Sequence, residues 1–169
     1  MKISSFRKLA FVTTVATYLL IFIGGVVRVT GAGLACPDWP TCFGGWLPPL
    51  SVADIPAGYD TANFSTMLVL LEFLNRAFTA IVAVLIVITA VFGIHGLKNA
   101  SRVIMALLGS LFLYGAQVWL SGEIIRTELN PFLVTLHFLI SLVVGSILTF
   151  VTVRAYYMEN PSEEGQSAY

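Results

Sequence analysis

Four long apolar stretches, joined by short polar links and one long loop, set the pattern of this chain. The stretches cover residues of about 9–29, 66–94, 103–120 and 131–155. A helix needs about 20 mainly apolar residues to cross the hydrocarbon core of a membrane, and each stretch is close to that length or longer. The pattern predicts an all-α integral membrane protein, a bundle of four transmembrane helices within residues 1–158, followed by a disordered cytoplasmic tail over 159–169.

The lengths of the polar links indicate how neighbouring helices are oriented. The links near 93–102 and 121–130 are short, so neighbouring helices should run antiparallel. The long link, residues 32–65, contains five of the seven prolines and predicts an ordered surface loop with little helix. Composition agrees with a membrane protein, because 57% of the residues are hydrophobic and 11% are charged, whereas ordinary soluble domains have about 25% charged residues.

The basic residues are unevenly distributed over the links, although the net charge is zero. Placing the N-terminus in the cytoplasm puts six of them inside: Lys2, Arg7, Lys8, Lys98, Arg102 and Arg154. The other three then lie outside: Arg28, Arg76 and Arg126. Because cytoplasmic segments are enriched in Lys and Arg, this favours both termini on the cytoplasmic side of the plasma or inner membrane, with the loop over 32–65 outside. The first stretch is long and more spans follow, which favours a retained helix over a cleaved signal peptide.

Three polar residues lie together early in the second apolar stretch: Glu72, Asn75 and Arg76. Their spacings of three and four residues place them on one face of a helix. Charges at membrane depth are unfavourable, so they commonly mark a functional site, a buried pair or a water-filled cavity. An equally good alternative is a Glu72–Arg76 pair that lies near the interface and only extends its charged ends toward the headgroups.

His137, in the fourth stretch, is a candidate ligand. It lies six residues from Pro131, and Asn75 lies nine residues from Thr66, so both reach depths of roughly 10–14 Å from the outer face and can meet across the bundle. A lone histidine on an apolar helix is commonly a hydrogen-bonded structural residue. Four-helix bundles, however, hold cofactors with inward side chains, and imidazole is a usual axial ligand of heme iron. This favours ligation of heme iron by His137. His95, at the cytoplasmic end of the second helix, is expected to cap that helix.

Cys36 and Cys42, the two cysteines of the chain, are separated by five residues in the predicted outer loop. An oxidising compartment favours a disulfide between them. One interpretation is a structural cross-link. The alternative is redox chemistry coupled to the membrane, in which exposed thiols exchange electrons with a partner.

Three motifs resemble those of a known family, in the same order along the chain. The first is the run over 24–42, Gly-Gly-Val-Val-Arg-Val-Thr-Gly-Ala-Gly-Leu-Ala-Cys-Pro-Asp-Trp-Pro-Thr-Cys. The second is Glu-Phe-Leu-Asn-Arg over 72–76, and the third is Gln-Val-Trp-Leu-Ser-Gly over 117–122, which continues to His137. Together they resemble the heme A synthases, also called cytochrome oxidase assembly membrane proteins, over all of the chain except its tail.

The resemblance implies a fold, an activity and partners. Most family members have eight spans in two four-helix halves, and this chain resembles the half with the cysteine loop, which implies a homo-oligomer or pairing with another half-chain. The family oxidises the C8 methyl group of heme O to a formyl group and so makes the heme A of terminal oxidases. The implied ligands are heme b, heme O or heme A, as cofactor or substrate. The implied partners are membrane lipid, the heme O synthase and a terminal oxidase, and no nucleic acid is expected.

The site residues of the family can be carried over position by position. By resemblance, His137 matches the heme ligand of the fourth helix, Glu72 the acidic residue linked to catalysis, and Arg76 the motif arginine. Cys36 and Cys42 match the cysteines that form the disulfide of the outer loop. The resemblance therefore implies a catalytic carboxylate, an iron ligand and a cross-linked loop.

Asn75 departs from the pattern, because it stands where the family has the heme-ligating histidine of the second helix. With His137 as the one strong ligand, the iron would keep an open side that Asn75 could line as a hydrogen-bond donor. Alternatively, two copies of His137 hold one heme at a dimer interface. Arg76 or Arg28 could pair with the heme propionates. Glu72 would stabilise positive charge on the oxidised carbon or position a water molecule.

Several function classes remain open at this stage. The leading hypothesis is a half-length heme A synthase or a close relative that acts on a heme side chain. A noncatalytic heme-binding or assembly subunit, paired with another half-chain, is favoured by Asn75. A quinone-linked thiol oxidoreductase is less favoured, because such enzymes resemble Cys-x-x-Cys proteins with a second cysteine pair. Transport is also disfavoured, because no broken helix or paired repeat indicates a substrate path.

Overall fold

The structure, a computed structural model, describes residues 3–97 and 100–158. It contains four long helices: α1 (Ile3–Val29), α2 (Thr66–Gly96), α3 (Ser101–Arg126) and α4 (Pro131–Tyr156). Two short 3-10 helices, η1 (Ala32–Leu34) and η2 (Val52–Asp54), lie between α1 and α2. All four long helices are long and apolar enough to span a membrane, and no β-strand occurs within the described ranges. The predicted all-α transmembrane bundle is thereby confirmed; the predicted tail over 159–169 lies outside the described residues.

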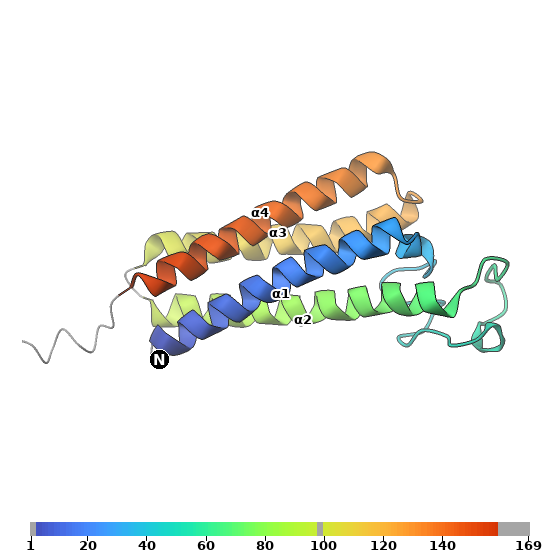
Figure 1. The fold of residues 1–169 in the computed structure, drawn as a ribbon, viewed down its shortest axis with the longest axis horizontal. Helices are drawn as coiled ribbons and strands as arrows, with labels where there is room; N and C mark the ends of the chain where they lie inside the picture. The colour runs from blue at the N-terminus through green and yellow to red at the C-terminus, as the bar shows by residue number, and fades with distance from the viewer. Residues whose placement is uncertain (1–2, 98–99, 159–169) are drawn as a thin grey trace, which may run out of the picture.

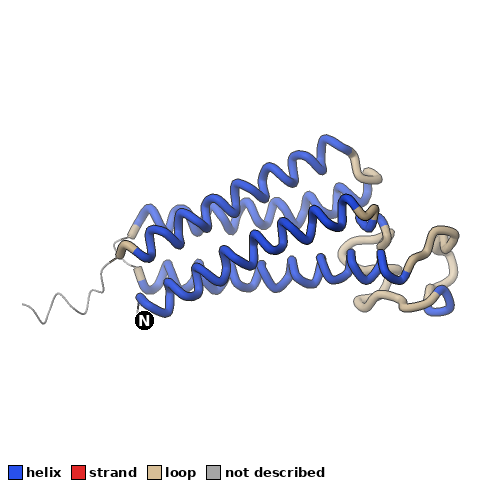
Figure 2. The backbone as a smooth tube through the Cα atoms, in the orientation of Figure 1, coloured by secondary structure: helices blue, strands red, loops and turns tan. Residues whose placement is uncertain are grey.

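The four helices form a ring in which each packs against two neighbours. α1 packs against α2 and α4, and α3 packs against the same two helices. Figure 1 shows the start of α1 and the end of α4 at one end of the bundle and the long loop at the other. The same loop is drawn in tan in Figure 2, beyond the ends of α1 and α2. Consecutive helices therefore run antiparallel, as the short links predict.

Two helices extend beyond the apolar stretches that predict them. α1 begins at Ile3 instead of about residue 9, and α3 ends at Arg126 instead of about residue 120. The last turn of α3 contains an exposed ion pair of 2.8 Å between Arg126 and Glu123. Hydropathy detects the part of a helix that suits lipid, whereas backbone hydrogen bonds continue through polar turns. The predicted link over 121–130 is therefore shorter in the structure and covers only residues 127–130.

Tight packing closes the bundle at the end where the chain starts. Phe6 of α1, Ala90 of α2 and Leu107 of α3 are fully buried there in one apolar cluster. Gly93 of α2 suits this packing, because a Cβ atom at that position would clash with Leu107 Cδ1 unless the leucine side chain moved. The end that the charge pattern assigns to the cytoplasm is thus filled by packed apolar side chains.

Buried threonines link the helices nearer the middle of the bundle. Thr13 Oγ1 of α1 lies 2.8 Å from Thr89 Oγ1 of α2, and Thr14 Oγ1 lies 2.9 Å from Thr152 Oγ1 of α4. In lipid a buried hydroxyl needs such a partner, because no water is available to replace it. These pairs fix α1 between α2 and α4 below the cavity that lies toward the loop.

The loop between α1 and α2 is cross-linked and packed on itself. Cys36 and Cys42 form a disulfide with their Cα atoms 4.8 Å apart, which confirms the predicted cross-link. The ring of Phe43 packs edge-on against Tyr59 and Phe64, with centroid distances of 5.3 and 6.0 Å. These contacts explain how a loop with only two short helical turns is ordered.

Candidate cofactor site

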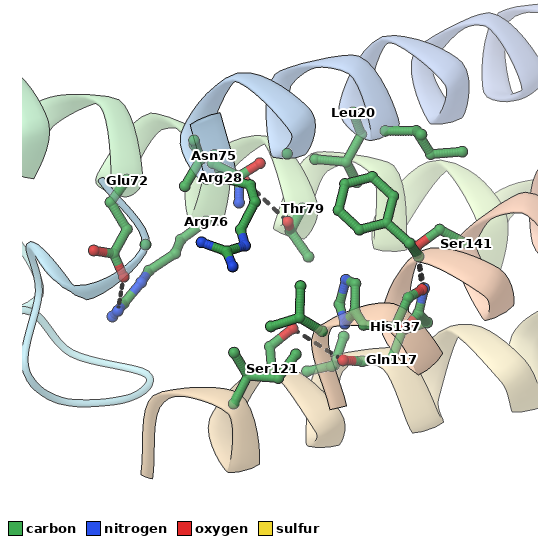
Figure 3. A pocket seen from close by; sticks show the side chains of 18 of the residues that line it. Leu20, Arg28, Glu72, Asn75, Arg76, Thr79, Gln117, Ser121, His137 and Ser141 are labelled. Carbon is green, nitrogen blue, oxygen red and sulfur yellow. Dashed lines mark hydrogen bonds and ion pairs between the residues drawn. The ribbon is translucent and has the colours of Figure 1, made fainter. Parts of the chain in front are cut away.

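A cavity of about 180 Å³ lies inside the loop-bearing end of the bundle. All four helices contribute to its wall, and Trp39 lines it from the loop. Figure 3 shows Glu72 and Arg76 near the loop, and Gln117 and His137 at the α3–α4 side of the open space. The remaining lining side chains are mainly apolar. A mainly apolar cavity with a few convergent polar groups is the usual form of a small-molecule or cofactor site.

Three buried polar atoms of this cavity have no hydrogen-bond partner within the described part of the chain: Asn75 Oδ1 on α2, Gln117 Oε1 on α3 and His137 Nδ1 on α4. We call these three atoms the open triad. A buried polar atom that lacks a partner destabilises a protein by about 1–3 kcal/mol. Three such atoms from three helices around one cavity indicate that the cavity receives a ligand or water that completes their hydrogen bonding.

The structure brings His137 and Asn75 to the same cavity, as their depths along the helices predict. Figure 3 shows Asn75 on α2 at one side of the open space and His137 on α4 at the other. The imidazole is partly buried, and its Nδ1 belongs to the open triad. A structural histidine would have its buried ring nitrogen satisfied by the surrounding protein. His137 Nδ1 is instead left without a protein partner, which favours a histidine that serves a bound molecule over a purely structural one.

Glu72 and Arg76 form an ion pair beneath the cysteine loop, with side chains only 5% and 9% exposed. Glu72 Oε2 also accepts a hydrogen bond of 2.8 Å from the backbone N–H of Cys36. Arg76 donates to the carbonyl oxygens of Asp38 and Thr41, at 2.7 and 2.6 Å. This burial favours a buried pair over one that only extends its charged ends toward the headgroups. The pair is buried and binds the loop to α2.

Trp39 fixes the cavity side of the loop. Its ring lies 5.1 Å from Arg76 Cζ, a cation–π contact. It also packs against Gly122 of α3, where a Cβ atom would lie 2.8 Å from Trp39 Cδ1. This close approach explains the glycine at position 122. Through Trp39, the loop is held on α3 as well as on α2.

Two residues of the site carry no prediction from the sequence: Trp39 and Gln117. Each nevertheless has a signal in the chain. Trp39 lies inside the first family motif, and Gln117 is the one side-chain amide in α3 and begins the third motif. Their contacts join different helices, so their roles at the site emerge only in the folded bundle.

The disulfide is shielded from solvent. Cys36 is 0% and Cys42 is 2% exposed. Thiol–disulfide exchange requires a thiolate to reach a sulfur atom, and burial hinders that approach. The structure therefore supports a cross-linking role over redox chemistry by exposed thiols.

Arg28 is the basic residue of the cavity wall whose side chain is exposed to solvent. It lines the cavity from the end of α1, is exposed, and forms no ion pair within residues 3–97 and 100–158. Arg76, in contrast, directs its donors to Glu72 and to loop carbonyls. Guanidinium groups bind carboxylates through charge-assisted hydrogen bonds. Arg28 is thus placed to bind an anionic group of a ligand at the cavity mouth.

The residues of this cavity fit a heme better than a bare metal ion. The described residues contain no group of three His, Cys, Asp or Glu side chains that could hold a metal ion. A porphyrin supplies the equatorial ligands of its own iron and needs only an axial ligand from the protein, which the imidazole of His137 can provide. The apolar wall suits the porphyrin ring, and Arg28 suits a propionate.

Comparison with known proteins gives one family and several relatives. The family model described as "Cytochrome oxidase assembly protein" matches residues 7–168. The chain is 27% identical over 146 residues to the heme A synthase of Geobacillus kaustophilus, covering 84% of this chain and 40% of that protein. It is 26% identical over 163 residues to the heme A synthase of Exiguobacterium sibiricum, covering 94% and 49%.

A third relative has a different name. The chain is 29% identical over 159 residues to the protoheme IX farnesyltransferase 1 of Natronomonas pharaonis, covering 94% of this chain and 30% of that protein. The chain thus spans between 30% and 49% of the length of these three curated relatives.

Proposed function

The chain belongs to the cytochrome oxidase assembly protein family, and from this premise we propose that it is a half-length heme A synthase-like membrane oxidoreductase. It converts heme O to heme A, for the assembly of terminal oxidases, by oxidising the C8 methyl group to a formyl group. The observation that carries the proposal is the imidazole of His137, which lines a mainly apolar cavity between four membrane-spanning helices and contributes an atom to the open triad.

Each site residue has a role in this proposal. The bound heme supplies a redox-active iron and carries the methyl group. His137 would hold the iron through its imidazole, and Arg28 would hold a propionate at the exposed side of the cavity. In this proposal the carboxylate of Glu72, which lines the cavity and stays ion-paired with Arg76, stabilises positive charge at the oxidised carbon or orients a water molecule. Arg76 acts through Glu72, because it binds one of the carboxylate oxygens directly.

The reaction requires an oxidant from outside the chain. With dioxygen as the oxidant, the overall change is R–CH3 + O2 → R–CHO + H2O. Dioxygen is thereby reduced and the methyl carbon is oxidised, whether the inserted oxygen atom comes from dioxygen or from water. The contribution of the chain is to bind the heme, orient it and place charge beside the reacting carbon.

The proposed orientation has both termini in the cytoplasm and the cysteine loop outside. Four described basic residues lie at the end of the bundle where the chain starts: Arg7, Lys8, Arg102 and Arg154. At the loop end, Arg76 is buried, which leaves Arg28 and Arg126 as the exposed basic side chains of the helices. The enrichment of basic residues in cytoplasmic segments supports this orientation.

A second four-helix unit is part of the proposal. The chain spans 40% and 49% of the two heme A synthases, so a second copy or a companion half-chain would supply a unit of similar size. A region similar to this chain also occurs in a protein named protoheme IX farnesyltransferase 1. That similarity supports a heme O synthase as a neighbour in the membrane, with a terminal oxidase as the recipient of the product.

Pigment analysis tests the proposal directly. Protein purified from a host that makes heme O is expected to show the absorbance spectrum of a heme protein. Chromatography and mass spectrometry of the extracted pigment are expected to detect heme A or its hydroxylated precursor, which the same host without the chain does not make. A preparation without heme would contradict both the binding and the reaction. A preparation that carries only unmodified hemes would contradict the reaction.

A noncatalytic heme-binding or assembly subunit is the second candidate function. It is favoured by Asn75, which lines the cavity where the family has a histidine. An amide is a poor ligand of heme iron, so the chain would bind heme and deliver it to another half-chain. This candidate predicts the heme spectrum without any heme A in the extract.

Asn75→His tests whether positions 75 and 137 face the same iron. We expect the variant to convert a high-spin heme spectrum to a low-spin one, because a second imidazole would complete the axial ligation. Optical absorbance and electron paramagnetic resonance measure the spin state. Asn75→Gln keeps an amide and should stay high-spin. A spin state that does not change in Asn75→His would contradict the facing arrangement.

A further inference from the structure

Gln117 is a buried polar residue of the cavity wall that has no role in the proposed reaction. It lies on α3 and is 6% exposed. Its Nε2 donates to the backbone carbonyl oxygen of His137 at 3.0 Å and to Ser141 Oγ. A carbonyl oxygen can only accept, so the amide nitrogen must be the atom that faces α4. This fixes the orientation of the amide and leaves Oε1, an acceptor only, in the open triad.

The imidazole of His137 offers the complementary group. A neutral imidazole carries one N–H donor and one nitrogen lone pair, and the position of the proton follows from the available partners. His137 Nδ1 is buried and belongs to the open triad, and α3 packs directly against α4. Figure 3 shows the two side chains at the same side of the cavity. The two atoms are not hydrogen-bonded to each other in the structure, so a single water that accepts from Nδ1–H and donates to Oε1 would satisfy both.

We propose that Gln117 is a positioning residue whose Oε1 holds one water that accepts the Nδ1–H of His137, and so fixes the tautomer in which Nε2 keeps its lone pair for a ligand. Metal-ligating histidines nearly always donate their other ring N–H to an oxygen acceptor, which orients the ring and raises its basicity. The identity of the ligand rests on the proposed function. The tautomer rests only on the chain itself and can be measured without heme.

The Gln117 amide also helps to position the backbone of α4 beside His137. Ser141 Oγ also donates to the His137 carbonyl oxygen, at 2.8 Å. Gln117 thus bonds through Nε2 to the helical turn that carries His137, and its Oε1 stays without a protein partner. With the proposed water on Oε1, a single side chain on α3 sets both the position of the α4 backbone at this turn and the orientation of the imidazole.

Nitrogen NMR of the heme-free protein tests the proposal. The chain has only two histidines, so labelling with 15N-histidine gives two imidazoles, and His95→Gln assigns them. At about pH 9, well above the ordinary imidazole pKa of about 6.5, we expect His137 to be protonated at Nδ1. Protonation at Nε2 in the unmodified protein would overturn the proposal without any variant.

Variants identify the acceptor. Gln117→Leu is expected to move the proton of His137 toward Nε2, whereas Gln117→Glu, which keeps an oxygen acceptor, retains it on Nδ1. Ser141→Ala removes the neighbouring hydroxyl but leaves Oε1 in place, and should leave the tautomer unchanged. A shift in Asn75→Leu but not in Gln117→Leu would make Asn75 the acceptor and contradict the proposal.

Heme titration gives a second, separate readout. Loss of an acceptor behind a ligating histidine typically weakens metal affinity by about 10–100-fold, and Gln117→Leu should weaken heme binding within that range while Gln117→Glu rescues it. If the unmodified protein shows the Nδ1–H tautomer but binds no heme, the proposed function fails and the role of Gln117 stands. If it binds heme and the tautomer is Nε2–H, the role of Gln117 fails and the proposed function stands.

Discussion

His137→Ala is expected to leave the bundle folded but to lose its heme. The imidazole is the axial ligand that the cavity offers, and its removal should weaken heme affinity by more than about 100-fold, the upper end of the effect of losing only a supporting acceptor. The absorbance spectrum and the heme-to-protein ratio of the purified variant measure this loss. Circular dichroism should show that the helical content is unchanged, because the packed core lies toward the opposite end of the bundle.

The matched control is the other histidine of the chain. His95 lies at the far end of α2, where its Nδ1 is 2.9 Å from the carbonyl oxygen of Val91. His95→Ala should therefore keep the heme-to-protein ratio of the unmodified protein. Imidazole added to His137→Ala should restore part of the heme spectrum by occupying the vacated space. A His137→Ala protein that keeps its heme at the original ratio would show that another residue is the ligand.

Arg76→Leu is expected to release the cysteine loop and strongly destabilise the protein. The substitution leaves Glu72 buried without its counter-ion, and breaking a buried pair in this way typically costs about 3–5 kcal/mol. It also removes the donors to the carbonyl oxygens of Asp38 and Thr41. The free energy of unfolding in detergent should fall by that amount. The disulfide, now shielded, should become accessible to a reductant, which alkylation of the freed thiols detects.

Two further variants show whether the effect belongs to the buried pair. Glu72→Gln combined with Arg76→Leu should recover part of the lost stability, because no isolated charge remains buried. Arg126→Leu is the surface control, because its pair with Glu123 is exposed, and such a pair contributes less than about 1 kcal/mol. Equal effects of Arg76→Leu and Arg126→Leu would refute the anchoring role of Arg76.

The residues on one face of α2 show which features of the site could be predicted from the sequence. Their spacing predicts that Glu72, Asn75 and Arg76 share a helix face, and all three do line the cavity. Their partners differ, however: Glu72 and Arg76 bond to the cysteine loop, whereas Asn75 Oδ1 belongs to the open triad. Spacing alone does not separate these roles, because the loop that covers the pair belongs to a different part of the chain.

The sequence by itself determined the properties that depend on position along a helix. Lipid requires each span to be apolar over about 20 residues and to satisfy its own backbone hydrogen bonds, so the four spans and their antiparallel order could be predicted. The similar depths of Asn75 and His137 follow from the same one-dimensional geometry. Only the helix ends differed, because helices continue through polar turns beyond the lipid-facing stretch.

Only the tertiary structure decided which side chains are satisfied by the protein and which are left for a ligand. That outcome depends on the rotation of each helix about its axis and on the path of the loop between α1 and α2, and neither can be read from spacing. The packed threonines and the core near Phe6 close one end of the bundle. The cavity at the other end is lined by residues distant in sequence, among them Trp39, Gln117 and His137.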